Sequence, residues 1–173
     1  GGACAECALW GAGNLQEMSG EGRWKAGAGV SDESGRGLSG GDSWEEAEGK
    51  FQEKAAKLAI EHAGLQQKEI RYNVAGDLLG QLMASSFGLL SLQIPLFGVY
   101  GACSTMGESM GIAAMIVEGG FADHVLALTS SHFASAEKQF RFPLGYGNQR
   151  PKASTWTATG SGAVVISKSV LEE

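Results

Sequence analysis

The sequence has no long apolar run, no excess of positive charge and few cysteines. Ser91, Gln93 and Pro95 interrupt its most apolar stretch, so no segment reaches the roughly 18 apolar residues that a membrane-spanning helix needs. With 13 lysines and arginines against 19 acids, the net charge of −6 argues against a nucleic-acid partner or an anionic membrane. No basic start followed by an apolar block marks a signal peptide. Three cysteines favour a reducing compartment such as the cytosol over a disulfide scaffold.

Metal ligands at useful spacing are also scarce. Cys4 and Cys7 form a C-x-x-C pair, but no second pair and no histidine pair accompanies it at a suitable distance. A tetrahedral metal site needs four ligands. We therefore expect no metal site and no cofactor.

What the sequence does have is glycine, and its distribution divides the chain. Twelve of the 27 glycines lie in the first 41 residues. Glycine at that density gives up backbone entropy without adding side chains to a core, so 1–41 is expected to be a loose lead-in with at most one strand, at 4–10. Residues 42–173 have the length and hydrophobic content of one folded domain.

From Ser43 onward, helix and strand signals alternate. Ser43 and Glu46 form a capping box, and Trp44, Ala47, Phe51, Ala55, Leu58 and His62 recur at spacings of three and four, which predicts a helix ending at Gly64. The patterns that follow predict strands at 70–75, 95–100, 125–130 and 162–167, with helices at 81–90 and 104–117. This order predicts an α/β fold of three layers, with a largely parallel or mixed sheet covered on both faces.

The helix at 104–117 is small or apolar on nearly every side, which predicts that it is buried all round. Cys103 comes just before it, at a turn between a buried strand and this helix. Unpaired N–H groups at a helix N-terminus favour a thiolate, so Cys103 is a candidate nucleophile or anion contact. The alternative is an inert buried cysteine, because free cysteine is among the most buried residue types.

A second candidate region begins at His132, which also follows a strand. Ligands of open α/β sheets bind outside the carboxyl ends of the strands, so His132 is either a ligand contact or a satisfied core residue. The segment 132–152 is basic and aromatic within an acidic chain. Arg141 in this segment could grip a carboxylate while an aromatic ring stacks on a planar acid, although arginine and aromatics are also typical of subunit interfaces.

Five stretches occur in one order: AGDLL at 75–79, YGACST at 100–105, EGGFA at 118–122, TSSH at 129–132 with AEKQFRFP at 136–143, and TGSGAVVIS at 159–167. Together they resemble the stage V sporulation protein AD family over 43–167. The resemblance implies a thiolase-like fold, of which this chain corresponds to the N-terminal half. The segment 1–41 does not match the opening of the family.

The resemblance also implies a function. It implies binding of dipicolinic acid (pyridine-2,6-dicarboxylic acid), free or as its calcium complex, during its movement into the forespore. It further implies a peripheral location on the cytoplasmic side or surface of the spore inner membrane, beside other channel proteins. The candidate ligand-binding residues are Cys103, His132, Arg141 and Asp77, the last from the first motif.

The sequence leaves two alternatives open. In thiolase-like enzymes the elbow cysteine carries an acyl group, so Cys103 could serve an acyl-transferring enzyme, although the second half supplies the acid–base partners. The chain could instead be only an assembly module. Because a half fold leaves apolar surface uncovered, we expect a homo-oligomer or association with a missing C-terminal half.

Overall fold

The computed structural model describes residues 24–31, 41–140 and 157–168. Their strands are β1 (Trp24–Ser31), β2 (Tyr72–Asp77), β3 (Leu96–Gly98), β4 (His124–Ser131) and β5 (Gly160–Ser167). Their α-helices are α2 (Trp44–His62), α3 (Met83–Gly88), α4 (Thr105–Glu118) and α5 (Phe133–Phe140). Three short 3-10 helices, η2 (Gln67–Glu69), η3 (Leu90–Leu92) and η4 (Ala102–Ser104), connect them.

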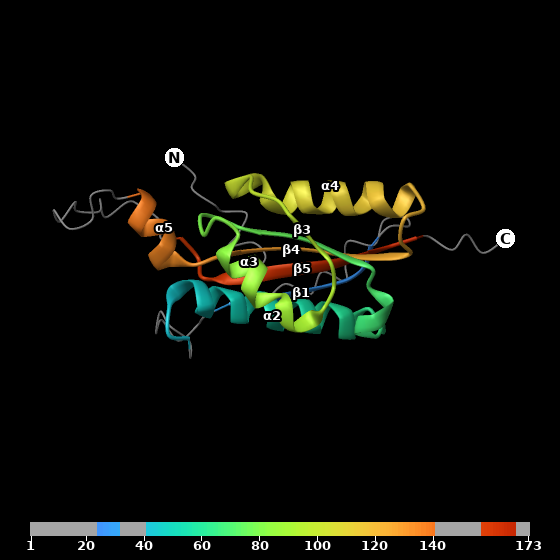
Figure 1. Ribbon diagram of the computed structural model, residues 1–173, viewed down its shortest axis with the longest axis horizontal. Helices are drawn as coiled ribbons and strands as arrows, with labels where there is room; N and C mark the ends of the chain where they lie inside the picture. The colour runs from blue at the N-terminus through green and yellow to red at the C-terminus, as the bar shows by residue number, and fades with distance from the viewer. Residues whose placement is uncertain (1–23, 32–40, 141–156, 169–173) are drawn as a thin grey trace.

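The described strands form one sheet in the order β1-β5-β4-β2-β3. The pairs β2–β3 and β2–β4 are parallel, whereas β4–β5 and β1–β5 are antiparallel. The sheet is therefore mixed, with its parallel part centred on β2. Figure 1 shows α2 on one face of this sheet and α4 on the other, which confirms the three layers.

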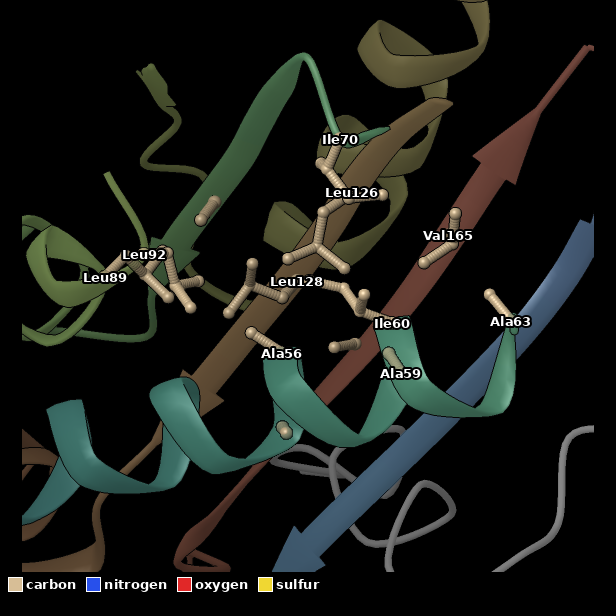
Figure 2. Close-up of a cluster of buried hydrophobic side chains, with 13 residues drawn as sticks. Ala56, Ala59, Ile60, Ala63, Ile70, Leu89, Leu92, Leu126, Leu128 and Val165 are labelled. Atoms are coloured by element: carbon tan, nitrogen blue, oxygen red, sulfur yellow. The ribbon is translucent and has the colours of Figure 1, made fainter. Parts of the chain in front are cut away.

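Alternating side chains of the central strands fill two cores. On the α2 side, Leu126, Leu128 and Val165 pack against helix residues such as Ala59 and Ile60 (Figure 2). On the α4 side, residues one position further along the same strands pack against Ala113 and Val117. Since both faces of these strands are covered, their sequences read as continuous apolar runs.

Helix α2 begins as its capping signal predicts, because the Glu46 N–H donates to Ser43 Oγ at 3.1 Å. Its buried face is different from the predicted one. The predicted stripe included Phe51, which is half-buried, and His62, which is exposed. The face that contacts the sheet consists mainly of small or polar side chains: Ala47, Glu48, Gly49, Gln52, Ala55, Ala56, Ala59 and Ile60. Small side chains allow the helix to lie close to the strands.

Helix α4 corrects another expectation, because it is not buried all round. Its buried residues, Thr105, Ser109, Ala113 and Val117, form one stripe with a spacing of four that faces the sheet. The opposite side exposes Met115, and the positions where Gly107 and Gly111 would carry a Cβ face open space. The composition of α4 is typical of full burial, but the described residues of this chain cover only one side of it.

The glycine-rich lead-in contributes a strand that composition did not predict. β1 pairs along most of its length with β5, with Gly27 opposite Val164 and Gly29 opposite Gly162. The backbone of β1 hydrogen-bonds to β5 and so forms a strand. The pattern of its own side chains does not indicate this partner. The strand expected at 4–10 lies outside the described residues.

Candidate functional site

Three of the predicted site residues lie at one end of the sheet, where the parallel strands finish. Asp77 is the last residue of β2, Cys103 follows β3 in η4, and His132 follows β4 directly. In Figure 1, α4 and α5 both start on the left, at this end of the sheet. The fourth candidate, Arg141, lies outside the described residues.

The elbow that carries Cys103 sits tightly on the end of β2. A Cβ on Gly76 would lie 2.0 Å from the carbonyl oxygen of Val99 and 2.6 Å from Thr105 Cγ2, so only glycine allows this approach. Thr105 is fully buried, and its Oγ1 accepts a hydrogen bond from the Gly101 N–H at 3.2 Å. Ala102 adopts a left-handed conformation with φ 51°, an uncommon one for a residue with a side chain. The elbow is therefore held in a defined and strained geometry.

Cys103 is exposed at this elbow, and its thiol is free. The expectation that Cys103 is buried, part of the alternative reading, is therefore wrong. Ser104 Oγ donates to the Gly101 carbonyl at 2.8 Å and lies within hydrogen-bond distance of Glu108 Oε1. The carboxylate of Glu108, in the first turn of α4, thus lies at the elbow, close to Ser104 and Gly101.

Asp77, in contrast, is completely buried, and its carboxylate accepts hydrogen bonds from the loop that follows it. Its carboxylate accepts hydrogen bonds from the Leu82 N–H at 3.2 Å and from Ser85 Oγ at 3.2 Å. Gln81 and Leu82 both have positive φ, which a right-handed helix does not adopt. Helix α3 therefore starts at Met83 and not at 81. Asp77 therefore holds the loop between β2 and α3.

Behind Asp77 lies a buried polar network that the sequence did not reveal. Gln52 of α2 donates through Nε2 to Ser85 Oγ at 3.0 Å and to Ser130 Oγ at 2.6 Å. Ser130 Oγ in turn donates to Glu48 Oε1 at 2.6 Å. The chain of hydrogen bonds thus connects the buried carboxyls of Glu48 and Asp77 through one glutamine and two serines.

Burial raises the pKa of the Glu48 carboxyl to about 7. The hydrogen bond from Ser130 opposes this rise, and the negative charges of Asp77 and Glu45 add to it. Glu48 and Gln52 are four residues apart, so they share one side of α2. Polar residues at this spacing among the alanines of a helix that faces a sheet are the signal that could have predicted the network.

His132 is also buried, at 1% exposure, between two aromatic rings. Its ring stacks on Trp44 of α2 with centroids 6.5 Å apart and on Phe133 at 5.4 Å. Its Nδ1 accepts a hydrogen bond from the Ala134 N–H at 3.2 Å, at the start of α5. The ring thus fixes the joint between β4 and α5, and Trp44 links it to the helix that carries Glu48 and Gln52.

These placements separate the candidates by accessibility. Cys103 faces outward, whereas Asp77 and His132 support the same end of the sheet from inside. Among the residues that the structure describes, no group of three or more histidine, cysteine or acidic side chains could hold a metal ion. Within the same residues, no helix has the length and hydropathy needed to cross a membrane.

Comparison with solved structures defines the class of the fold. The chain matches 3-oxoacyl-[acyl-carrier-protein] synthase III from Aquifex aeolicus VF5 with a TM-score of 0.53 and 22% identity, over 68% of this chain and 37% of that one. It matches a fungal type III polyketide synthase with a TM-score of 0.56 and 15% identity, over 69% and 34% of the two chains. The fold is therefore thiolase-like.

Sequence comparison defines the family within this class. Residues 16–172 match the family Stage V sporulation protein AD. The Stage V sporulation protein AD of Bacillus subtilis (strain 168) is 47% identical over 126 residues, which cover 73% of this chain and 37% of that protein. The chain belongs to the Stage V sporulation protein AD family and spans just over a third of the length of this relative. The match includes β1, so the glycine-rich segment from residue 16 onward lies within it.

Proposed function

We propose that this chain takes part in spore formation by binding dipicolinic acid and assisting its transport into the forespore. Membership of the Stage V sporulation protein AD family supports the role in sporulation. The ligand is proposed on chemical grounds. It is a flat aromatic ring with two carboxylates, and it requires anion contacts beside a planar surface.

The observation that carries this proposal is the exposed elbow at Cys103, at the sheet end where His132 and Asp77 are anchored. Backbone N–H groups at the start of α4 suit a carboxylate. His132 and Asp77 are covered, so we assign them the role of fixing the walls of the site. Arg141 follows α5, which starts at the same end of the sheet, and is proposed to bind the second carboxylate.

Glu108 bears on the form of the ligand. Its carboxylate lies over the first turn of α4, close to Ser104 and Gly101. A bare dianion would be repelled there, whereas calcium bound to dipicolinate offsets its charge and accepts oxygen ligands. We therefore favour the calcium complex as the bound form.

The partners and location belong to the same proposal. We propose a peripheral position on the cytoplasmic side or surface of the spore inner membrane, beside other channel proteins. The uncovered side of α4, including Met115, suits a C-terminal half of the fold, and edge strand β3 with exposed Phe97 suits a homo-oligomer.

Calorimetry tests the ligand assignment. Calcium dipicolinate is titrated into this chain and, in parallel, into the Bacillus subtilis relative. We expect binding by both, and Arg141→Ala should weaken it about tenfold to a hundredfold, the effect of losing one charge-assisted contact. Benzoate, with one carboxylate, serves as the control. Equal binding of benzoate, an unchanged affinity of Arg141→Ala, or binding by the relative alone would contradict the proposal.

A second function rests on the exposure of Cys103. A thiolate at this elbow could attack the carbonyl carbon of an acyl thioester, forming a new thioester on Sγ and releasing the original thiol. Incubation with an acyl thioester followed by mass spectrometry of the peptide containing Cys103 tests this, with Cys103→Ser as the control. An adduct confined to the wild-type peptide would favour the enzyme over the binding protein.

A further inference from the structure

Helices α2 and α3 cross in direct backbone contact on the face of the sheet opposite α4. A Cβ on Gly88 would lie 2.5 Å from Gly49 Cα, and one on Gly49 would lie 3.1 Å from Gly88 Cα. No side chain fills this crossing, because both residues are glycine. A groove lies at this crossing, lined by residues of both helices.

The groove has a volume of about 380 Å³ and is lined by Ser43, Glu45, Glu46, Gly49, Lys50, Glu53, Met83, Phe87, Gly88 and Ser91. Its two sides differ in chemistry. Residues of α2 supply the acidic side, and Met83 and Phe87 of α3 supply the apolar side. An amphipathic groove of this kind is suited to a partner with one apolar and one charged side.

The apolar side is unusually exposed. Met83 is 51% exposed and Phe87 is 68% exposed, and Leu90, one turn further along, is 63% exposed. The three residues are spaced four and three apart, so they lie on one side and form a continuous apolar ridge. Exposed apolar surface that is rimmed by charge marks interaction sites.

On the acidic side, Glu46 and Glu53 are paired with lysines, whereas Glu45 has no such partner among the described residues. Glu46 pairs with Lys50 at 3.0 Å, and Glu53 pairs with Lys57 at 2.6 Å and accepts from Ser91 Oγ. Within the described part of the chain, the Glu45 side chain has no hydrogen bond or ion pair with another residue. Three carboxylates against the single ammonium of Lys50 leave the lining with an excess of negative charge.

We propose that this groove binds a short amphipathic segment of a partner protein, with apolar side chains on Met83 and Phe87 and a lysine or arginine directed to Glu45. The groove is lined mainly by residues of α2 and α3 on the face of the sheet opposite α4, so the site is separate from the elbow at Cys103. The inference does not depend on the proposed ligand.

A designed probe tests the groove on this chain. The probe is a short fluorescent helical peptide with leucines on one side and lysines on the other, and its counterpart carries glutamates in place of the lysines. We expect the lysine peptide to bind by fluorescence anisotropy and the glutamate peptide not to bind. Phe87→Ser should weaken binding about tenfold, the loss typical of an aromatic anchor, and Glu45→Lys should weaken it more at low than at high salt.

The control is Glu61→Lys, which makes the same charge change at an exposed position at the far end of α2. It should change the affinity less than twofold, by the rule that rim charges away from a contact contribute little. Thermal unfolding checks that each variant is folded, and Met83→Ser replaces Phe87→Ser should the latter unfold. Calcium dipicolinate binding should be the same in Phe87→Ser and wild type, which separates the two proposals.

Three results would overturn the inference. The first is failure of the lysine peptide to bind. The second is an equal loss of affinity in Glu45→Lys and Glu61→Lys, which would indicate general attraction to an acidic surface. The third is self-association of the chain that Phe87→Ser abolishes in sedimentation, which would make the groove a contact between two copies.

Discussion

Replacing Glu48 by glutamine should make the stability of the protein less dependent on pH. Glu48 is 1% exposed and accepts a hydrogen bond from Ser130 Oγ, which a glutamine side-chain oxygen can also accept. The substitution keeps the shape of the side chain and removes its ability to ionise. It therefore isolates the free energy of placing a charge in the buried network.

The magnitude follows from the pKa of about 7 in the folded state against the ordinary value of 4.5. Below the lower value the carboxyl is protonated in both states and costs nothing. Between the two values only the unfolded chain loses the proton, so stability falls as pH rises, and above pH 7 the full penalty remains. At 1.36 kcal/mol for each pH unit, this one group should cost the folded protein about 3 kcal/mol near neutral pH.

Urea unfolding at about pH 4 and about pH 8 measures this effect for both proteins. We expect Glu48→Gln to match the wild type in acid and to exceed it by about 2–3 kcal/mol at the higher pH. Glu61→Gln, at an exposed position of the same helix, should follow the wild-type profile. Parallel profiles of Glu48→Gln and wild type would refute the reasoning, because they would show that folding does not raise the pKa of Glu48.

Three further substitutions test the packing by urea unfolding. Gly76→Ala places a Cβ against the Val99 carbonyl and should lower the free energy of unfolding by about 2–3 kcal/mol; an unchanged midpoint would contradict the close approach. Gly111→Ala meets open space on α4 and should raise it by about 1 kcal/mol through helix propensity, whereas a loss would show hidden crowding. Leu128→Ala removes a fully buried side chain and should cost about 3 kcal/mol, with a loss below 1 kcal/mol counting against the core.

Helices α2, α3 and α4 and the central strands could be predicted because their signals are local, whereas α5 was not predicted. Ser43 marks the start of α2, and the continuous apolar runs of β4 and β5 reflect burial on both faces. β1 could not be predicted in the same way, because its hydrogen bonds depend on a partner strand far away in the sequence. The extent to which α4 is covered is likewise a property of its surroundings, which its own composition does not determine.

The candidate site could be predicted only in outline. The rule that ligands bind at the carboxyl ends of strands pointed to Cys103 and His132, which do follow strands at one end of the sheet. Asp77, a candidate from the family motif alone, lies at the same end. It could not rank their exposure, because burial depends on how α2 and α5 pack over that end. An apolar stripe on α2 does not predict the polar network of Glu48 and Gln52, because the face of α2 that contacts the sheet is partly polar.

The place of β1 in the sheet has a consequence for the order of events during synthesis. Trp24 lies opposite Ile166, so β1 is synthesised before its partner strand. It cannot pair until nearly all of the described chain that follows it has been made. Strands β2, β3 and β4 can pair across much shorter separations, and pairing across short loops is faster. The parallel part of the sheet should therefore assemble first. Strand β5 then docks on β4, and the first strand of the described chain is the last to be added.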